Sequence, residues 1–202
     1  MAGMIPVTPQ PEPEDFDTEV RQKGLRWLAK HDIDITVALP PGTKLRAYWQ
    51  SCLKELHRRY GGVCAYLAVF FERTTRAGNV EHFHPKSLRP DLAYEWCNYR
   101  LACSAINSRK NNFTDVLDPF EVKDDWFYLE LVSGHIFPNP QLPASLQQKI
   151  QATIDRLKLD HRDNNEMRAE HYQLYCEGKI TSEYLKGYSP FVWKEADRQG
   201  LL

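Results

Sequence analysis

The sequence predicts an α+β fold, and three observations support this. Apolar residues recur at helical spacing near the N-terminus and again from about residue 144 onward. Between these regions, short runs rich in β-branched and aromatic residues are separated by turn-forming residues, as is typical of strands. The composition is that of a globular protein, with 42% hydrophobic and 26% charged residues among 202. A chain of this length can bury a core, which argues against a disordered chain or a disulfide-stapled miniprotein.

The N-terminal part is expected to be an arm followed by two helices. Prolines with acidic neighbours predict a flexible, solvated arm over residues 1–14. Helical periodicity predicts one helix over about 16–31 and a second that begins at Thr43, as its cap, and ends near Tyr60. Residues 15–60 therefore form the expected N-terminal helical segment.

The middle of the chain, residues 61–120, is expected to hold strands and one polar helix. The apolar run 63–71 and the segment 79–85 predict two short strands joined by a turn. Residues 94–103 predict a further strand, which leads into a helix over 104–112.

The C-terminal part, residues 121–202, is expected to combine a hairpin with helices. Residues 126–137 alternate around Ser133 and Gly134, which predicts a β-hairpin. From about Ala144 the apolar residues recur on one helical face.

Charge and hydropathy limit the classes of function. Lys and Arg number 26 against 27 Asp and Glu, so a strongly basic nucleic-acid coat is excluded, whereas a local basic patch is not. No apolar run is long enough to cross a membrane, and the start does not resemble a secretion signal, so we expect a cytoplasmic protein. A basic face is expected on the second helix, either as part of a phosphate-binding patch or as an ordinary solvated face; it comprises Lys44, Arg46, Lys54, Arg58 and Arg59.

Four polar residues in the middle segment suit phosphodiester hydrolysis. A neutral imidazole, such as that of His82, can take a proton from water near pH 7. Glu81 and Asn107 can offer hard oxygen ligands to a divalent cation that stabilises the phosphate. Asn98 can hold the His82 ring, or the loop that carries it, by a hydrogen bond.

The segments CAYL, VEHFHPKS and YEWCNYRLACSAINSRKNN together resemble the core of HNH endonucleases, in particular the HNH proteins of retron and Septu-type anti-phage systems. Asp118 and Pro119, the expected hairpin and the helix around Thr153 extend the resemblance to about residues 60–165. The fold that the resemblance implies is the ββα-metal finger, here with flanking helices and an extra hairpin.

The resemblance also implies residue roles. Glu81 and Asn107 would bind the metal, Mg²⁺ as the expected ion and Mn²⁺ as a compatible one. His82 would be the general base and Asn98 its orienting residue. Lys110 would contact phosphate.

The chain departs from the family at the structural zinc, which in the family is held by two C-x-x-C pairs. Cys64 and Cys103 are kept, but Leu67 and Ile106 stand at the partner positions. Two thiolates make a poor structural zinc site, so we expect the zinc to be lost and replaced by a plug in which Leu67 packs near Ile106. Retained zinc, with Cys97 as a third ligand, is the alternative.

Three further residues are candidates for nucleic-acid binding. His84 lies two positions after His82 and is compatible with a phosphate contact, an auxiliary ligand or a plain surface histidine. Lys86 could follow a backbone phosphate. Arg109, like Lys110, could either bind phosphate or be a solvated helix residue.

The expected function is therefore metal-dependent cleavage of nucleic acid, with DNA favoured over RNA. The family context implies an anti-phage effector with a protein partner, often an ATPase. The alternatives are a module that has lost catalysis but binds nucleic acid or a partner, and an effector that cuts RNA.

Overall fold

The computed structural model describes residues 6–75 and 77–202. It contains α-helices and two small antiparallel sheets, so the α+β prediction is confirmed. The chain divides into two compact units, which we call the N-terminal unit (9–62 and 71–114) and the C-terminal unit (6–8, 63–70 and 115–202). The candidate site lies in the N-terminal unit.

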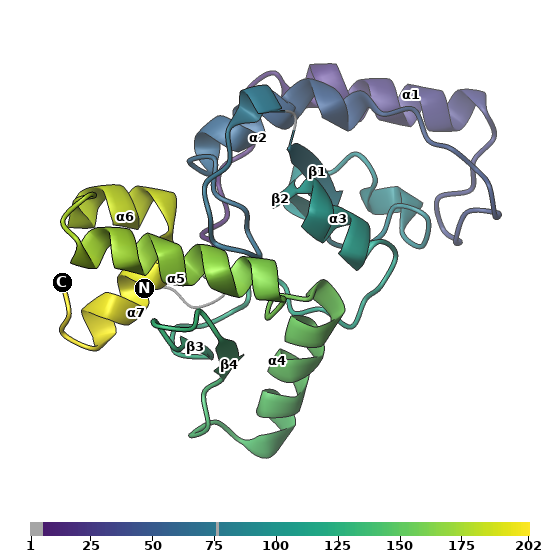
Figure 1. The fold of residues 1–202 in the computed structure, drawn as a ribbon. Coiled ribbons are helices and arrows are strands. Elements are labelled where there is room, and N and C mark those ends of the chain that lie inside the picture. The colour runs from purple at the N-terminus through teal and green to yellow at the C-terminus, as the bar shows by residue number, and fades with distance from the viewer. Residues whose placement is uncertain (1–5, 76) are drawn as a thin grey trace. The chain divides into compact units, whose positions relative to one another are not determined.

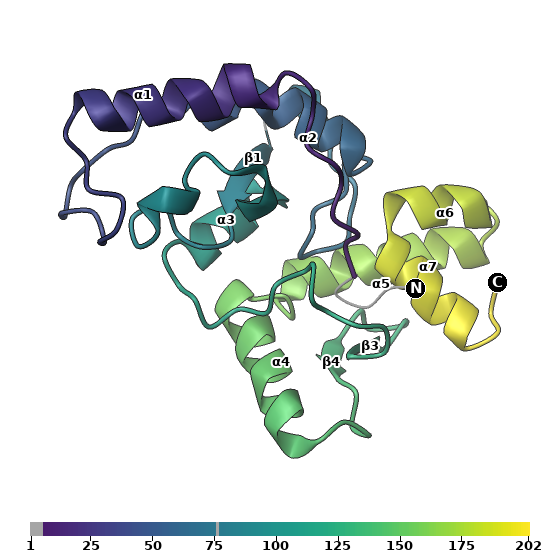
Figure 2. The same cartoon turned by 180° about the vertical axis from the view of Figure 1, so that it is seen from behind.

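Two helices open the N-terminal unit. A π-helical turn, Asp17–Arg21, continues directly into α1 (Gln22–Lys30), which confirms the first predicted helix. A 3-10 turn, Tyr48–Cys52, leads into α2 (Leu53–Arg59). Figures 1 and 2 both show α1 and α2 lying together over the strand pair of this unit.

The second predicted helix is too long at its start. The Thr43 amide donates to the Pro40 carbonyl at 3.1 Å, and Gly42 between them has a φ of +85°. These features define a turn in which proline and glycine occupy the two central positions. Thr43 therefore closes a turn and does not cap a helix, and helical structure begins only at Tyr48.

A strand pair and a helix complete the N-terminal unit. Strand β1 (Gly78–His82) pairs antiparallel with β2 (Tyr99–Cys103), with His82 opposite Tyr99, and α3 (Ser104–Lys110) follows β2 at once. The predicted strand over 94–103 begins later, because Trp96–Asn98 form a 3-10 turn. The predicted helix over 104–112 is confirmed to Lys110, where Asn111 leaves the helix with a φ of +43°.

The prediction of a strand over 63–71 is wrong. In this segment, all of which the structure describes, the only β-type pairing is an isolated bridge between Val63 and Phe70. Ala68 has a φ of +53°, and its amide donates to the Cys64 carbonyl at 2.9 Å. The run therefore folds back on itself as a turn. Its apolar composition reflects burial and not an extended conformation, since Cys64 and Ala68 are both buried.

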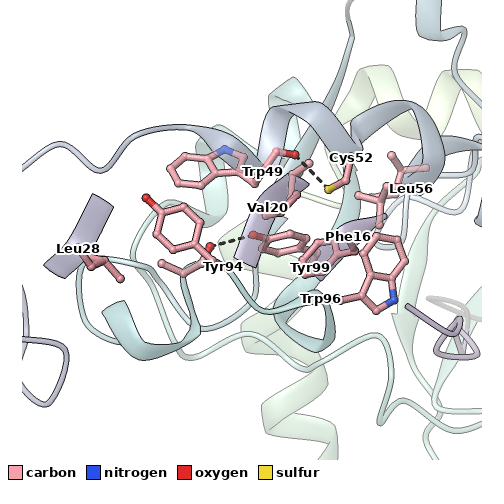
Figure 3. Packing of buried hydrophobic residues seen from close by; sticks show 12 residues of the cluster. Phe16, Val20, Leu28, Trp49, Cys52, Leu56, Tyr94, Trp96 and Tyr99 are labelled. Carbon is pink, nitrogen blue, oxygen red and sulfur yellow. Dashed lines mark hydrogen bonds between the residues drawn. The ribbon is translucent and has the colours of Figure 1, made fainter. Parts of the chain in front are cut away.

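Aromatic residues form the core of the N-terminal unit (Figure 3). The Phe16 ring meets the rings of Trp96 and Tyr99 edge-on at centroid distances of 5.5 and 5.7 Å. The Tyr99 hydroxyl donates to the Ala93 carbonyl at 2.9 Å. Such edge-on pairs add to the gain from burial, so this cluster anchors β2 beneath the first helix.

The N-terminal arm is held in place over part of its length. Trp96 Nε1 donates to the Gln10 carbonyl at 2.8 Å, and the Gln10 amide donates to the Tyr60 hydroxyl at 3.1 Å. Residues 9–14 are thus packed on the N-terminal unit, contrary to the flexible arm that the sequence predicts. Residues 1–5 of the predicted arm lie outside the described residues.

The C-terminal unit contains the predicted hairpin, β3 (Phe127–Leu129) and β4 (Ile136–Pro138). Its helices are α4 (Ala144–Leu157), α5 (Arg162–Cys176), α6 (Ser182–Tyr188) and α7 (Pro190–Arg198). Helix α4 packs beside β4, whereas α5, α6 and α7 pack on one another and α7 reaches β3 (Figure 2).

A buried arginine joins the hairpin to α5. The Arg168 guanidinium donates to the carbonyls of Gly134 and Leu159 at 3.0 and 2.8 Å. Burial lowers the pKa of Arg168 to about 10, which still leaves it charged at neutral pH.

Within the described residues, no helix is long and apolar enough to cross a membrane.

The close approach of α1 to Tyr94 requires glycine at position 24. A Cβ atom on Gly24 would lie 2.2 Å from the Tyr94 ring. We expect Gly24→Ala to lower the free energy of unfolding by about 1–3 kcal/mol, because the overpacked ring must move. The matched control is Gly187→Ala in α6, where a Cβ meets no atom within 4 Å and alanine favours the helix. Urea unfolding measures both variants, and equal stability of the two would contradict the prediction.

Candidate functional site

A cleft of about 350 Å³ lies where the end of β1 faces α3, and Glu81, His82 and Asn107 all line it. Strand β1 supplies the first two residues and α3 supplies the third. Adjacent strand residues normally point to opposite faces, but His82 is the last residue of β1 and the chain bends after it. The remaining lining residues are mostly polar: Trp49, Gln50, Asn79, Val80, Pro85, Lys86, Ser108, Asn111 and Asn112.

The His82 ring is held in one orientation by its surroundings. Its Nε2 atom lies 3.0 Å from the Ala93 carbonyl, and the rings of Trp49 and Tyr99 pack edge-on against it at 4.7 and 5.1 Å. Because a carbonyl oxygen can only accept a hydrogen bond, Nε2 carries the hydrogen of the neutral ring. The lone pair is therefore on Nδ1, which is the atom able to take a proton.

The surroundings also keep His82 neutral. The pKa of His82 is lowered to about 3, chiefly because burial disfavours the charged ring and also because Lys86 and Lys110 lie nearby. The hydrogen bond to Ala93 opposes this shift. At neutral pH the imidazole is consequently unprotonated and able to accept a proton, while its low pKa makes it a weak base.

Glu81 forms a buried ion pair with Lys110. Lys110 Nζ lies 2.7 Å from Glu81 Oε1, and both side chains are almost completely buried. The same ammonium group donates to the carbonyls of Phe83 and His82 at 2.8 and 3.2 Å. These bonds use all three donors of Lys110. Lys110 thus fixes the Glu81 carboxylate and the end of β1. This buried position differs from the phosphate contact that the resemblance implies and also from its alternative, a solvated helix residue.

Asn98 holds the loop that follows His82. Its Oδ1 accepts from the His84 amide at 2.8 Å, and its Nδ2 donates to the carbonyls of His84 and Leu92, both at 3.0 Å. Of the two contacts considered for Asn98, the ring or its loop, the structure shows the loop. The Ala93 carbonyl, which also accepts the Tyr99 hydroxyl, orients the ring itself.

The Asn107 side chain is half-buried in the cleft. Its backbone carbonyl accepts from the Asn111 amide at 3.0 Å, which closes the end of α3. The side-chain amide makes no hydrogen bond to another residue between 6 and 75 or between 77 and 202. It is therefore available to a ligand in the cleft.

The three candidate nucleic-acid contacts are placed differently. Lys86 lines the cleft, with its ammonium group 5.4 Å from the centre of the Trp49 ring, and burial lowers its pKa. His84 is exposed, and Arg109 is half-buried on α3; neither lines the cleft. The cleft thus brings together Glu81, His82, Lys86 and Asn107, while Asn98 and Lys110 support it through the backbone.

Several cleft residues were missed by reasoning from the sequence, among them Trp49, Gln50 and Asn79. Trp49 and Gln50 come from the 3-10 turn before α2, and no sequence signal links that turn to β1. Asn79 could have been found, since it lies two positions before Glu81 and strand alternation puts both on one face. Its amide donates to the Ser104 hydroxyl at 2.8 Å.

Glu81 and Asn107 are the cleft residues that could hold a magnesium or manganese ion. The Glu81 carboxylate and the Asn107 amide are oxygen donors, and Mg²⁺ in proteins is commonly held by one or two carboxylates with several waters. Among the described residues, no group of three His, Cys, Asp or Glu side chains is placed to bind a metal. A set of one carboxylate and one amide, close to the charges of Lys86 and Lys110, predicts low affinity.

The residues of the apolar plug that is expected in place of the zinc are divided between the two units. Cys64 and Leu67 belong to the C-terminal unit, whereas Cys103 and Ile106 belong to the N-terminal unit. Ile106 is fully buried and Leu67 half-buried. The loss of zinc, the packing of Leu67 near Ile106 and the alternative ligand Cys97 stay predictions.

No protein-family model matches this chain, and no curated protein matches it. The resemblance to HNH endonucleases therefore rests on the residues of the sequence alone.

The Glu81–Lys110 pair predicts a large stability effect. We expect Lys110→Met to lower the free energy of unfolding by about 3–5 kcal/mol, because it leaves a buried carboxylate without its partner. Adding Glu81→Met to this variant removes the unpaired charge and should restore part of the loss. Urea unfolding of both variants checks this, and a double variant no more stable than Lys110→Met would show that the pair is not responsible.

Proposed function

We propose that this chain is a metal-dependent endonuclease of the HNH type that hydrolyses phosphodiester bonds in nucleic acid. The observation that carries the proposal is the placement of His82. Its Nε2 hydrogen is committed to the Ala93 carbonyl, so that Nδ1 is the basic atom, and the residue lines one cleft with Glu81 and Asn107. The sequence resemblance supports the same assignment.

In the proposed reaction, His82 Nδ1 takes a proton from a water molecule as the water oxygen attacks phosphorus. A new phosphorus–oxygen bond forms and the bond to the 3′ oxygen breaks, and this leaving oxygen is protonated from solvent. A divalent cation bound by Glu81 and Asn107 would supply the positive charge that stabilises the phosphate and the leaving group. His82 later returns its proton to solvent.

The supporting residues have positioning roles. Lys110 holds the Glu81 carboxylate through its bond at 2.7 Å, and Asn98 holds the loop backbone at His84. Lys86 brings a positive charge to the cleft, where it can contact the substrate phosphate. The proposal thus keeps Lys86 as a phosphate contact and reassigns Lys110 to the support of the metal ligand.

A second hollow beside the cleft supports a polymeric phosphate substrate. It has a volume of about 430 Å³ and shares Gln50 and Asn79 with the cleft. Lys54 and Arg73 also line it, so positive charge continues away from the cleft. We propose DNA as the substrate on the strength of the resemblance, with RNA as the alternative.

The same resemblance supports a role in anti-phage defence together with an ATPase partner. The formal net charge of −1 fits a nuclease that needs help to hold its substrate. Co-purification of the native protein with an ATPase would support this part of the proposal.

Removal of the base gives the direct test. We expect His82→Ala to lower the rate of plasmid nicking in Mg²⁺ by at least about a hundredfold, which is the usual contribution of a general base. The control is His161→Ala, which removes an exposed imidazole from the C-terminal unit and should nick at the wild-type rate. Gel analysis of supercoiled plasmid, with tRNA as a parallel substrate, measures both. Equal nicking by His82→Ala and the wild type would rule out the assignment.

A specific observation favours a second function, binding of nucleic acid without cleavage. Lys110 already neutralises Glu81, so the carboxylate is satisfied in the protein without a metal. In that case the cleft would bind phosphate through Lys86 and need no cation.

Variants at Asn107 separate the two functions. We expect Mg²⁺ to raise the melting temperature of the wild type, because a ligand that binds only the folded state stabilises it. Asn107→Ala should reduce this rise, and Asn107→Asp should increase it by adding a second carboxylate. Thermal melts with increasing Mg²⁺ measure the effect, and identical responses from all three proteins would favour the metal-free binding function.

A further inference from the structure

A groove lies on the N-terminal unit between α1 and the segment 44–48, and the proposed mechanism does not use it. It consists of two hollows of about 650 and 380 Å³ that share Trp27, Arg46 and Tyr48. We call it the α1 groove; its other lining residues are Lys23, Arg26, Lys30, His31, Lys44, Leu45 and Ala47.

The α1 groove is strongly basic. Five of its lining residues are Lys or Arg, and none is Asp or Glu. Lys23 is paired with Glu19 at 2.6 Å. The other four, Arg26, Lys30, Lys44 and Arg46, are exposed and make no ion pair with any residue in 6–75 or 77–202.

Several other basic side chains of the protein have an acidic partner. On α2, for example, Glu55 accepts from Arg58 at 2.9 Å and from Arg59 at 2.7 Å. The basic face expected from the sequence is thus divided: Arg58 and Arg59 share the one carboxylate of Glu55, whereas Lys44 and Arg46 join cations of α1. A net chain charge near zero therefore conceals a concentrated positive patch.

The groove is a built surface and not a chance gathering of flexible side chains. The absence of a side chain on Gly24 lets α1 approach the Tyr94 ring. The Tyr94 hydroxyl donates to the Arg46 carbonyl at 2.8 Å, and its ring packs 6.2 Å from that of Tyr48. Tyr94 thereby fixes the backbone of the segment that faces α1.

Aromatic surfaces lie among the cations. Trp27 stacks on His31 one helical turn later, with ring centroids 4.1 Å apart and the planes inclined by 21°. Tyr48 is half-buried at the point where the two hollows meet. Positive grooves with aromatic rings are the surfaces on which proteins hold nucleic-acid strands, the cations contacting phosphates and the rings contacting bases.

We propose that the α1 groove is a second binding surface for the nucleic-acid substrate, which holds backbone phosphates away from the scissile bond. This rests on the proposed function for the identity of the substrate. Continuity with the cleft supports it: Tyr48 lines the groove, and the next residue, Trp49, lines the cleft with its ring 4.7 Å from that of His82. One strand can thus run from the groove into the cleft.

Equilibrium binding tests the groove without cleavage. A fluorescein-labelled oligonucleotide, as a single strand and as a duplex, is titrated with protein in EDTA, and anisotropy is recorded over a range of NaCl concentrations. The test variant is Arg26→Gln/Lys30→Gln/Arg46→Gln, whose altered side chains are all exposed. We expect it to bind at least about tenfold more weakly than the wild type, with a salt-dependence slope smaller by about 2–3, because each lost phosphate contact removes nearly one unit.

The matched control removes the same charge elsewhere. Arg156→Gln/Arg162→Gln/Lys179→Gln neutralises three cations that are each paired with an acid. We expect its affinity to stay within about twofold of the wild type, because these three cations line neither the groove nor the cleft and so displace no counterions from a phosphate bound there. Circular dichroism of both triple variants verifies that each is folded.

The outcomes separate the groove from the nuclease. Weaker binding by the groove variant, with the control variant unchanged, supports the proposal that the groove binds nucleic acid. If the wild type at the same time cuts no plasmid, only the nuclease proposal fails. Equal binding by the groove variant and the wild type overturns the proposal for the groove. The nuclease proposal is then tested by the cleavage assay alone. No binding of either labelled oligonucleotide by the wild type also overturns the proposal.

Discussion

The buried contact between Lys110 and Glu81 is the constraint on which the candidate site depends. It joins the last residue of α3 to the end of β1, and the same ammonium group holds the backbone at His82 and Phe83. A lysine and a glutamate that are both almost completely buried are tolerated only when each satisfies the other. The ion pair therefore sets where the carboxylate points and where the strand stops, and with them the mouth of the cleft.

A backbone carbonyl orients the His82 ring, whereas the sequence suggests a side chain, Asn98, for this role. His82 is oriented by the carbonyl of Ala93, and that oxygen is also bound by Tyr99 from the aromatic core. Asn98 acts one step away, on the loop backbone at His84 and Leu92. The proposed base is thus coupled directly to the packing of the N-terminal unit, so that substitutions in the core can alter the site without touching it.

The N-terminal helices contribute surface as well as stability. The turn before α2 places Trp49 against His82 and Gln50 in the cleft, while α1 provides Trp27 and cations such as Arg26 to the groove. These residues lie outside the segment that resembles HNH endonucleases. The resembling segment holds the candidate chemistry, and we infer that the preceding helices hold the polymer on which it acts.

The sequence by itself determined the elements with strong periodicity or a clear turn, such as α1, α4 and the hairpin of β3 and β4, because local spacing encodes them. It also singled out the polar residues at the end of β1 and on α3. Only the tertiary structure decided that Lys110 is buried, that the His82 ring is held by a carbonyl, and that the run 63–71 is a turn and not a strand. A side chain's partners and exposure depend on residues distant in the chain, and a one-dimensional pattern does not contain them.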